Sequence, residues 1–328
     1  MPLERVGSPV AHYRAPLWVH WFAVASAVAT LVLIFVGALV TSTGSGLAVP
    51  DWPLSFGQVF PPMVGGVLYE HGHRMVAAFV GMLTVTLVVL LSHWEARAWV
   101  RWLGCGALLA VILQGLLGGL TVLWRLPTAV SVTHACLAQA FFCLMVTLAV
   151  CTAPSWSTYR ALWTDERQPA LRLLATGTTA LVYGQLILGA LMRHTGAGLA
   201  IPDFPLAFGR LLPPFESQAV IVHFLHRLGA VIVTCGIVWT VVRVRHHFRT
   251  EPALMRPACT LLGLLVVQLV LGALTIWTKR AVLPMTAHVA VGAAVLATSL
   301  VLTLRAYRLV AVPARVHGRD VVAEQVTI

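Results

Sequence analysis

Charged residues are scarce in this chain of 328 residues: Asp, Glu, Lys and Arg make up 10% of it, and hydrophobic residues 59%. This composition excludes an ordinary water-soluble enzyme of the same size, because such a protein needs more polar residues to cover its surface. The apolar residues gather in eight stretches, each near the roughly 20 residues that cross a bilayer as a helix, and they predict an all-α integral membrane protein. The predicted transmembrane helices cover approximately residues 17–40, 75–92, 102–124, 130–151, 171–192, 219–242, 257–277 and 283–304.

Basic residues are absent from the first long loop, residues 41–69, although the chain has 22 Lys and Arg and a net charge of +11. Arginines gather instead at both termini and in alternate loops, from Arg5 and Arg14 to Arg315 and Arg319. The positive-inside rule then places both termini in the cytoplasm and this loop outside, for a multi-pass protein of the cell's inner (plasma) membrane. Because this placement explains the basic charge, the lipid bilayer is the expected partner and nucleic acid is not.

The cysteines form no Cys-x-x-Cys pair, and none falls in an external loop. A zinc or iron–sulfur site and an exported disulfide are therefore not indicated. All fall in or at the ends of predicted spans, where a cysteine serves as a small apolar packing residue. They are Cys105, Cys136, Cys143, Cys151, Cys235 and Cys259.

The chain contains an internal repeat. The segment 43–57 (TGSGLAVPDWPLSFG) matches 195–209 (TGAGLAIPDFPLAFG) almost residue for residue. Four spans per copy restore the same orientation, which predicts a parallel repeat of two four-helix bundles. The predicted units are an N-terminal repeat (1–153), a cytoplasmic linker (154–170), a C-terminal repeat (171–310) and a cytoplasmic tail (311–328).

The two duplicated loops are rich in Gly and Pro, which predict fixed turns. Each also carries an aspartate between prolines with an aromatic neighbour, Asp51 with Trp52 and Asp203 with Phe204. Because the same residues recur in both loops, we expect each loop to cover a site on the external side, since loops often carry function. The alternative is that each loop only joins two helices.

Four histidines stand at matching positions in the copies: His73 and His134 in the first, His226 and His288 in the second. All lie within about two helical turns of the external ends of their spans, so two histidines reach the same depth in each bundle. This geometry suits axial ligation of one haem from opposite faces in each half. Two imidazoles without thiolates or paired carboxylates would make a poor tetrahedral zinc or copper site. The alternative is that duplication preserved polar residues of the helix contacts.

Arginines and glutamines accompany these histidines in both copies. Arg74 and Arg227 each follow a candidate ligand and suit the propionates of a haem, unless they extend to lipid phosphate. Gln114 and Gln268 occupy matching positions in the third and seventh spans. The sequence leaves open whether these glutamines join helices or face a ligand.

Glu70 is the one member of the constellation without a twin. It precedes His73 by one helical turn, whereas the matching position carries His223. A carboxylate that lies beside a porphyrin, in a part of the membrane with little water, can exchange a proton or stabilise positive charge that develops on the porphyrin. Alternatively, Glu70 caps the start of its helix. Because His223 replaces it, we expect the fold not to need a carboxylate there, and Glu70 is the candidate catalytic residue. His71 and His223 are either neighbours of the site or interfacial residues.

Together these features closely resemble one family. The motif E-x-x-H-R from Glu70 to Arg74, the H-R pair at His226, the further histidines His134 and His288, and the paired T-G-x-G-L-x-x-P-D-x-P-L loops are those of the haem A synthases, the CtaA/Cox15 family. The resemblance extends from about residue 17 to 305. It is more specific than any one of these motifs.

The resemblance implies oxidation of the C8 methyl of haem O to a formyl by successive hydroxylations, with oxygen taken from water. It implies that His73 and His134 hold the substrate haem, with Glu70 as the catalytic carboxylate. His226 and His288 would hold a resident haem b that carries electrons. It leaves open whether haem O synthase delivers the haem O, which acceptor takes the electrons, and whether the chain forms a homo-oligomer.

One feature departs from the family. Some members carry a cysteine pair in the first external loop, where this chain has Val49 and Ser55, so a thiol–disulfide step is excluded here. The main alternative function is a di-haem electron-transfer protein of cytochrome b type that oxidises a quinol, although it gives no reason for Glu70 in only one half. A haem or small-molecule transporter is the third possibility, but the spans lack the interruptions near mid-membrane that such proteins favour.

Overall fold

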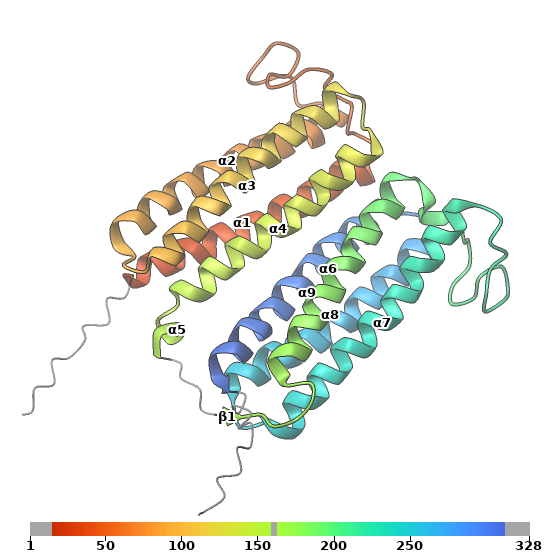
Figure 1. Ribbon diagram of the computed structural model, residues 1–328. Helices are drawn as coiled ribbons and strands as arrows, with labels where there is room; N and C mark the ends of the chain where they lie inside the picture. Colours follow the sequence, from red (N-terminus) through yellow and green to blue (C-terminus); the bar gives the residue numbers. More distant parts are fainter. Residues whose placement is uncertain (1–14, 159–162, 312–328) are drawn as a thin grey trace, which may run out of the picture.

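The computed structural model describes residues 15–158 and 163–311 and is mainly helical (Figure 1). Eight of its helices have the length and hydropathy of membrane spans, which confirms the predicted all-α membrane protein. They are α1 (Leu17–Ser42), α2 (Gly66–Trp94), α3 (Ala98–Leu123), α4 (Thr128–Thr152), α6 (Leu171–His194), α7 (Gln218–His247), α8 (Pro252–Trp277) and α9 (Val282–Leu309). The short elements are α5 (Pro154–Thr158), the 3-10 turn η1 (Ala197–Leu199), β1 (Trp163–Thr164) and β2 (Val310–Ala311).

Local chemistry sets several helix starts. Pro16 precedes α1, and Pro252 is the first residue of α8, where the missing N–H of a proline is not needed. At the start of α7 the Ser217 hydroxyl accepts the N–H of Val220 at 3.3 Å. The largest difference from the predicted spans is at α2, which begins at Gly66 rather than near residue 75. Hydropathy places the polar first turns of α2 in the preceding loop, because it does not reveal the hydrogen-bond partners that these polar side chains have in the folded chain.

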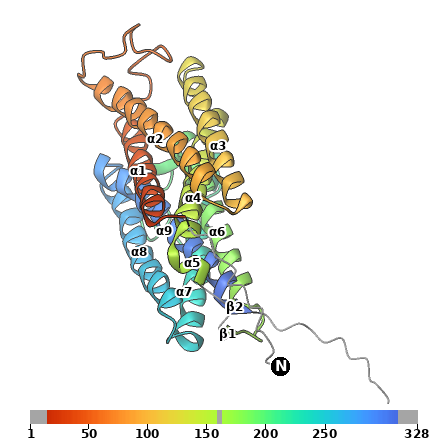
Figure 2. The same cartoon turned by 90° about the vertical axis from the view of Figure 1, so that its left-hand side faces the viewer.

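The long helices pack as two groups of four (Figures 1 and 2). In the first group α1 and α3 each contact α2 and α4, and in the second α6 and α8 each contact α7 and α9. It follows that α2 faces α4, and α7 faces α9, across the middle of its group. Each group encloses an apolar core, which includes Leu87 and Phe141 in the first and Ile237 and Leu261 in the second. This packing is consistent with the two predicted four-helix bundles.

The two groups are joined through α9 with α1 and α4, and through α6 with α4. Arg193 on α6 reaches into the first group, where its Nη2 donates to the carbonyl of Ala38 and the hydroxyl of Ser42, both at 2.8 Å. Thr286 on α9 donates to the same Ser42 hydroxyl at 2.9 Å. The position that matches Arg193 in the first copy is Thr41, so the first half has no arginine that could make the equivalent contact with the second.

Both long connections, residues 43–65 and 195–217, leave the same end of the molecule (Figure 1), which we name the loop end. At the opposite, linker end, β1 pairs in parallel with β2. Buried Asp165 accepts the N–H of Leu171 at 2.7 Å, so the linker is partly packed structure rather than a free polar segment. The predicted boundaries of the four units stay a prediction. Residues 1–14, 159–162 and 312–328, with their arginines and nearly all of the predicted tail, lie outside the described residues.

Candidate functional site

The two long loops close with the same turn. Asp51 accepts the N–H groups of Phe56 and Gly57 at 2.7 and 2.8 Å, and Asp203 binds the equivalent groups at the same distances. Phe56 has a φ of 53°, a left-handed conformation that a bulky residue rarely adopts unless its surroundings hold it. The Gly57 N–H, followed by that of Phe56, lowers the pKa of the Asp51 carboxyl. The two aspartates marked by the repeat therefore build the turns.

The loops also lie on the helices beneath them. The indole of Trp52 packs on Gly119 of α3, where a Cβ would stand 2.6 Å from the ring. In the second half the indole N–H of Trp277 on α8 donates to the carbonyl of Phe204 at 3.3 Å. The loops are therefore more than connectors, since each covers the ends of its own helices.

This contact predicts the effect of filling Gly119. We expect Gly119→Val to displace Trp52 and to release the first loop from α3, at a cost of about 1–3 kcal/mol for an overpacked contact. Gly115→Val is the matched control, because a Cβ at Gly115 of the same helix meets no atom within 4 Å. Limited proteolysis of the loop in detergent should be faster in the first variant only. Equal rates for the two variants would show that Trp52 does not anchor the loop.

Glu70 is buried, and both of its carboxylate oxygens are engaged at the loop end. Oε2 accepts the backbone N–H of Val49 at 2.8 Å, and Oε1 accepts Nη2 of Arg74 at 2.6 Å. Glu70 does not cap its helix, because the first turn of α2 has no acidic residue. Its carboxylate thus joins the first long loop, residues 43–65, to the part of α2 that carries His73.

The twin position makes the same loop contact without a carboxylate, as the sequence led us to expect. In the second half Nδ1 of His223 accepts the N–H of Ile201 at 3.2 Å, which is the contact that Glu70 makes with Val49. The fold therefore needs an acceptor at both positions, and either a carboxylate or an imidazole supplies it. What distinguishes Glu70 is its negative charge, because loop binding is common to the two copies.

Arg74 and Arg227 hold the loops. Nη1 of Arg74 donates to the carbonyls of Asp51 and Leu54 at 2.8 and 2.9 Å. Arg227 donates to three loop carbonyls between 2.6 and 3.2 Å, and its buried Nε has no hydrogen-bond partner. Sequence reasoning missed the loop contacts, although the duplicated loop was a signal for them. Pairing with haem propionates stays a prediction for both arginines.

His71, whose role the sequence left open, is buried beside the loop. Its Nδ1 forms a 2.8 Å hydrogen bond with the hydroxyl of Ser55, and its Nε2 is buried without a partner. Ser55 and Val49, the two loop residues noted in the sequence, contact His71 and Glu70 respectively. The matching second-half residues are Phe224 and Ala207, so this polar contact belongs to the first half alone.

The four candidate ligands all lie in the first turns of α2, α4, α7 and α9 from the loop end, and each ring packs against a glycine of the preceding long helix. A Cβ on that glycine would stand 3.0–3.2 Å from the Cε1 of the histidine. The pairs are Gly37 with His73, Gly118 with His134, Gly189 with His226 and Gly272 with His288. The absence of a side chain at each of these glycines makes room for an imidazole.

The histidines of each half fit a haem better than a bare metal ion. They come from helices that face each other across a group of four. Nδ1 of His73, His134 and His288 is buried without a partner, an arrangement that costs free energy unless a further group binds. Within residues 15–158 and 163–311, no three His, Cys, Asp or Glu side chains gather as a metal site. Two opposed imidazoles suit the axial positions of haem iron.

The glutamines left open by the sequence lie on ligand histidines. The amide nitrogen of Gln114 is 3.3 Å from Nε2 of His134 and also donates to its carbonyl at 3.0 Å. Gln268 lies in the same way 3.4 Å from Nε2 of His288. Both amides therefore contact the ring of a candidate ligand at Nε2 and leave Nδ1 as the ring nitrogen without a partner.

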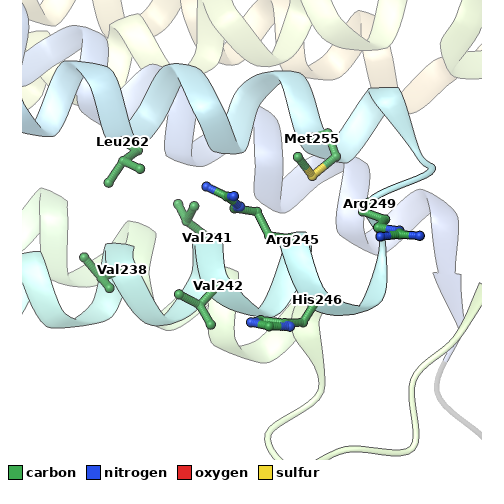
Figure 3. A pocket seen from close by; sticks show the side chains of 8 residues that line it. All are labelled: Val238, Val241, Val242, Arg245, His246, Arg249, Met255 and Leu262. Atoms are coloured by element: carbon green, nitrogen blue, oxygen red, sulfur yellow. The ribbon is translucent and has the colours of Figure 1, made fainter.

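A groove between α7 and α8 lies at the linker end, at the far end of α7 from His226 (Figure 3). It has an apolar wall and three basic side chains, Arg245, His246 and Arg249. None of the candidate site residues lines it. The groove therefore belongs to the basic linker end and not to the histidine sites.

Fold and site define a multi-pass membrane protein in which two facing helices of each half carry one histidine each near the loop end, an arrangement suited to haem. A sequence model of the COX15-CtaA family, described as cytochrome oxidase assembly protein, matches residues 64–300. The chain therefore belongs to this family.

Several relatives of this chain carry the name haem A synthase. The one from Geobacillus kaustophilus is 32% identical over 269 residues, which cover 79% of this chain and 82% of the relative. The one from Symbiobacterium thermophilum is 33% identical over 256 residues, which cover 74% of this chain and 81% of the relative. The one from Geobacillus thermodenitrificans is 30% identical over 312 residues, which cover 92% of this chain and 95% of the relative. The similarity thus includes both halves.

Proposed function

We propose that this protein is a haem A synthase, which oxidises the C8 methyl of haem O to a formyl by successive hydroxylations with oxygen from water. The observation that carries the proposal is a symmetric set of four histidines with a single asymmetric carboxylate, Glu70, beside one pair. Conversion of a methyl and a water to a formyl releases four electrons and four protons. An acceptor for protons and a route for electrons are therefore both required.

The first half is the proposed substrate site. His73 and His134 hold haem O there, in the space that Gly37 and Gly118 leave beside their rings. Glu70 lies one turn from His73, so its carboxylate is placed to accept protons and to stabilise positive charge that develops on the substrate. Arg74, bonded to Glu70 at 2.6 Å, holds this carboxylate in place.

The second half is the proposed cofactor site, where His226 and His288 hold haem b. When bound, haem b supplies one-electron transfer, which lets electrons leave the substrate site without a cysteine pair in the loop. Val49 and Ser55 cannot supply thiol chemistry, but they contact Glu70 and His71 and keep the loop closed over them.

The proposed setting is the inner (plasma) membrane, with the loop end outside and both termini in the cytoplasm. Haem O would reach the first half within the bilayer. An acceptor on the external side would take electrons from haem b. A homo-oligomer is compatible with the large apolar surface of the helices, such as Phe79 and Trp102.

Haem extraction tests the proposal against its main alternative, a di-haem quinol electron-transfer protein. The chain is expressed in a host that makes haem O but no haem A, and the membrane haems are separated by chromatography. We expect haem A to appear with the chain and to be absent with the empty vector. If the purified protein contains haem but no haem A ever forms, the chain is an electron carrier and the synthase assignment is wrong.

A further inference from the structure

The histidine of α7 has a polar contact that its counterpart in α2 lacks. Gln185 on α6 donates from Nε2 to the carbonyl of His226 at 2.7 Å, and the same nitrogen lies 3.1 Å from Nδ1 of that ring. Contact at Nδ1 leaves Nε2 as the ring nitrogen that is free to bind iron. The amide N–H of Gln185 can donate only to an unprotonated Nδ1. When Nε2 of the ring binds iron, Nδ1 carries the proton, and the amide serves it by turning over so that Oε1 accepts, at the loss of its bond to the His226 carbonyl.

This contact depends on a glycine. A Cβ added at Gly229, three residues after His226 on the same helix, would overlap the Oε1 of Gln185. The absence of a side chain at Gly229 is therefore what allows the Gln185 amide to lie along α7 and reach the ligand. Gln185 and Gly229 act as a pair, since a larger residue at either position would remove the contact.

The first half has neither member of the pair. The position matching Gln185 is Leu33, and the position matching Gly229 is Val76. Leu33 packs with the apolar core, and Nδ1 of His73 is buried without a partner. The other ligand of each half does not differ in this way, because Gln114 and Gln268 stand at the same place in both copies. The asymmetry is thus confined to one ligand, His73 against His226.

We propose that Gln185, seated on Gly229, is a positioning residue that makes the second half retain its haem, and that Leu33 with Val76 leaves His73 free to release the haem of the first half. This inference rests on the proposed function, in which one haem stays while substrate and product exchange in each catalytic cycle. A ligand whose ring is held by a hydrogen bond keeps its orientation, whereas an unheld ring can rotate away from the metal. The two copies thereby bind the same kind of group with different lifetimes.

Haem release from the purified holoprotein tests the proposal. Protohaem transfer from the second half to an excess of apomyoglobin is followed by absorbance. We expect Gln185→Leu to release protohaem about tenfold faster, the lower part of the range for losing a group that orients a metal-binding histidine. Thr234→Val is the matched control, because the Thr234 hydroxyl bonds only the carbonyl of Ala230 in its own helix. The low-spin electron paramagnetic resonance signal should change in Gln185→Leu and not in the control, since it reports the planes of the axial imidazoles.

The reverse exchange keeps the proposal falsifiable if Gln185→Leu does not fold. Leu33→Gln with Val76→Gly rebuilds the pair beside His73, and we expect haem O to leave the first half about tenfold more slowly. Unchanged release in both Gln185→Leu and the double variant would overturn the inference. The proposed function fails separately, if no haem A forms when the unaltered chain is expressed in a host that supplies haem O.

Discussion

Replacement of Glu70 by Gln is expected to lower haem A formation by about a hundredfold or more, the range that removal of a general acid or base produces. The amide keeps the size of the side chain and an oxygen that can accept the Val49 N–H, so the loop contact at 2.8 Å is preserved. It cannot accept a proton or offset positive charge. Haem A and haem O are quantified by chromatography of extracts from cells that supply haem O, with protohaem in the purified protein as the measure of folding.

The second half supplies a sharper control for this variant. Because His223 makes with Ile201 the contact that Glu70 makes with Val49, Glu70→His installs a loop acceptor that the fold already uses. If Glu70 acted only on the loop, Glu70→His would restore haem A to near the normal level while Glu70→Ala would not. If its charge carries the chemistry, all three variants fail alike and their protohaem content stays normal. Normal haem A in Glu70→His would therefore refute the catalytic role.

The features that repeat in the sequence could be predicted from it. Eight apolar stretches gave the eight spans, because hydropathy is the property that a bilayer selects. Matching residues in the two copies identified the four histidines and the duplicated loop. In that loop Asp51 and Asp203 stand at the same position. Each of these signals is either local in the chain or doubled within it.

The remaining features depend on contacts between residues distant in the chain. Nothing near Gly37 in the sequence shows that the His73 ring will lie on it, and Arg74 resembles a free cation until the folded loop brings carbonyls to it. The start of α2 was placed late for the same reason, since polar residues inside a helix need partners that hydropathy does not show. Leu33 and Gln185 occupy matching positions of the two copies, but the sequence does not show what their difference does. Only the folded chain brings the Gln185 amide to His226.

Loss of either ligand in the second half is expected to deplete protohaem from the purified protein. In the proposed site His226→Ala and His288→Ala would each remove one axial ligand and leave a cavity beside Gly189 or Gly272, so the loss of haem affinity should exceed the 10–100-fold that follows removal of an orienting partner. The haem type and its stoichiometry per chain are measured by the pyridine haemochrome spectrum and chromatography. His93→Ala is the matched control, because the ring of His93 is exposed at the linker end of α2 and bonds only within its own helix.

The first half should respond differently, which makes the comparison informative about which haem is resident. His73→Ala and His134→Ala are expected to retain the protohaem of the second half while haem A formation is lost, because the substrate no longer has both axial ligands. Full retention of protohaem in both His226→Ala and His288→Ala would contradict the assignment of the resident site. Loss of protohaem from His73→Ala with retention in His226→Ala would instead exchange the roles of the halves, and Glu70 would then stand beside the cofactor rather than the substrate.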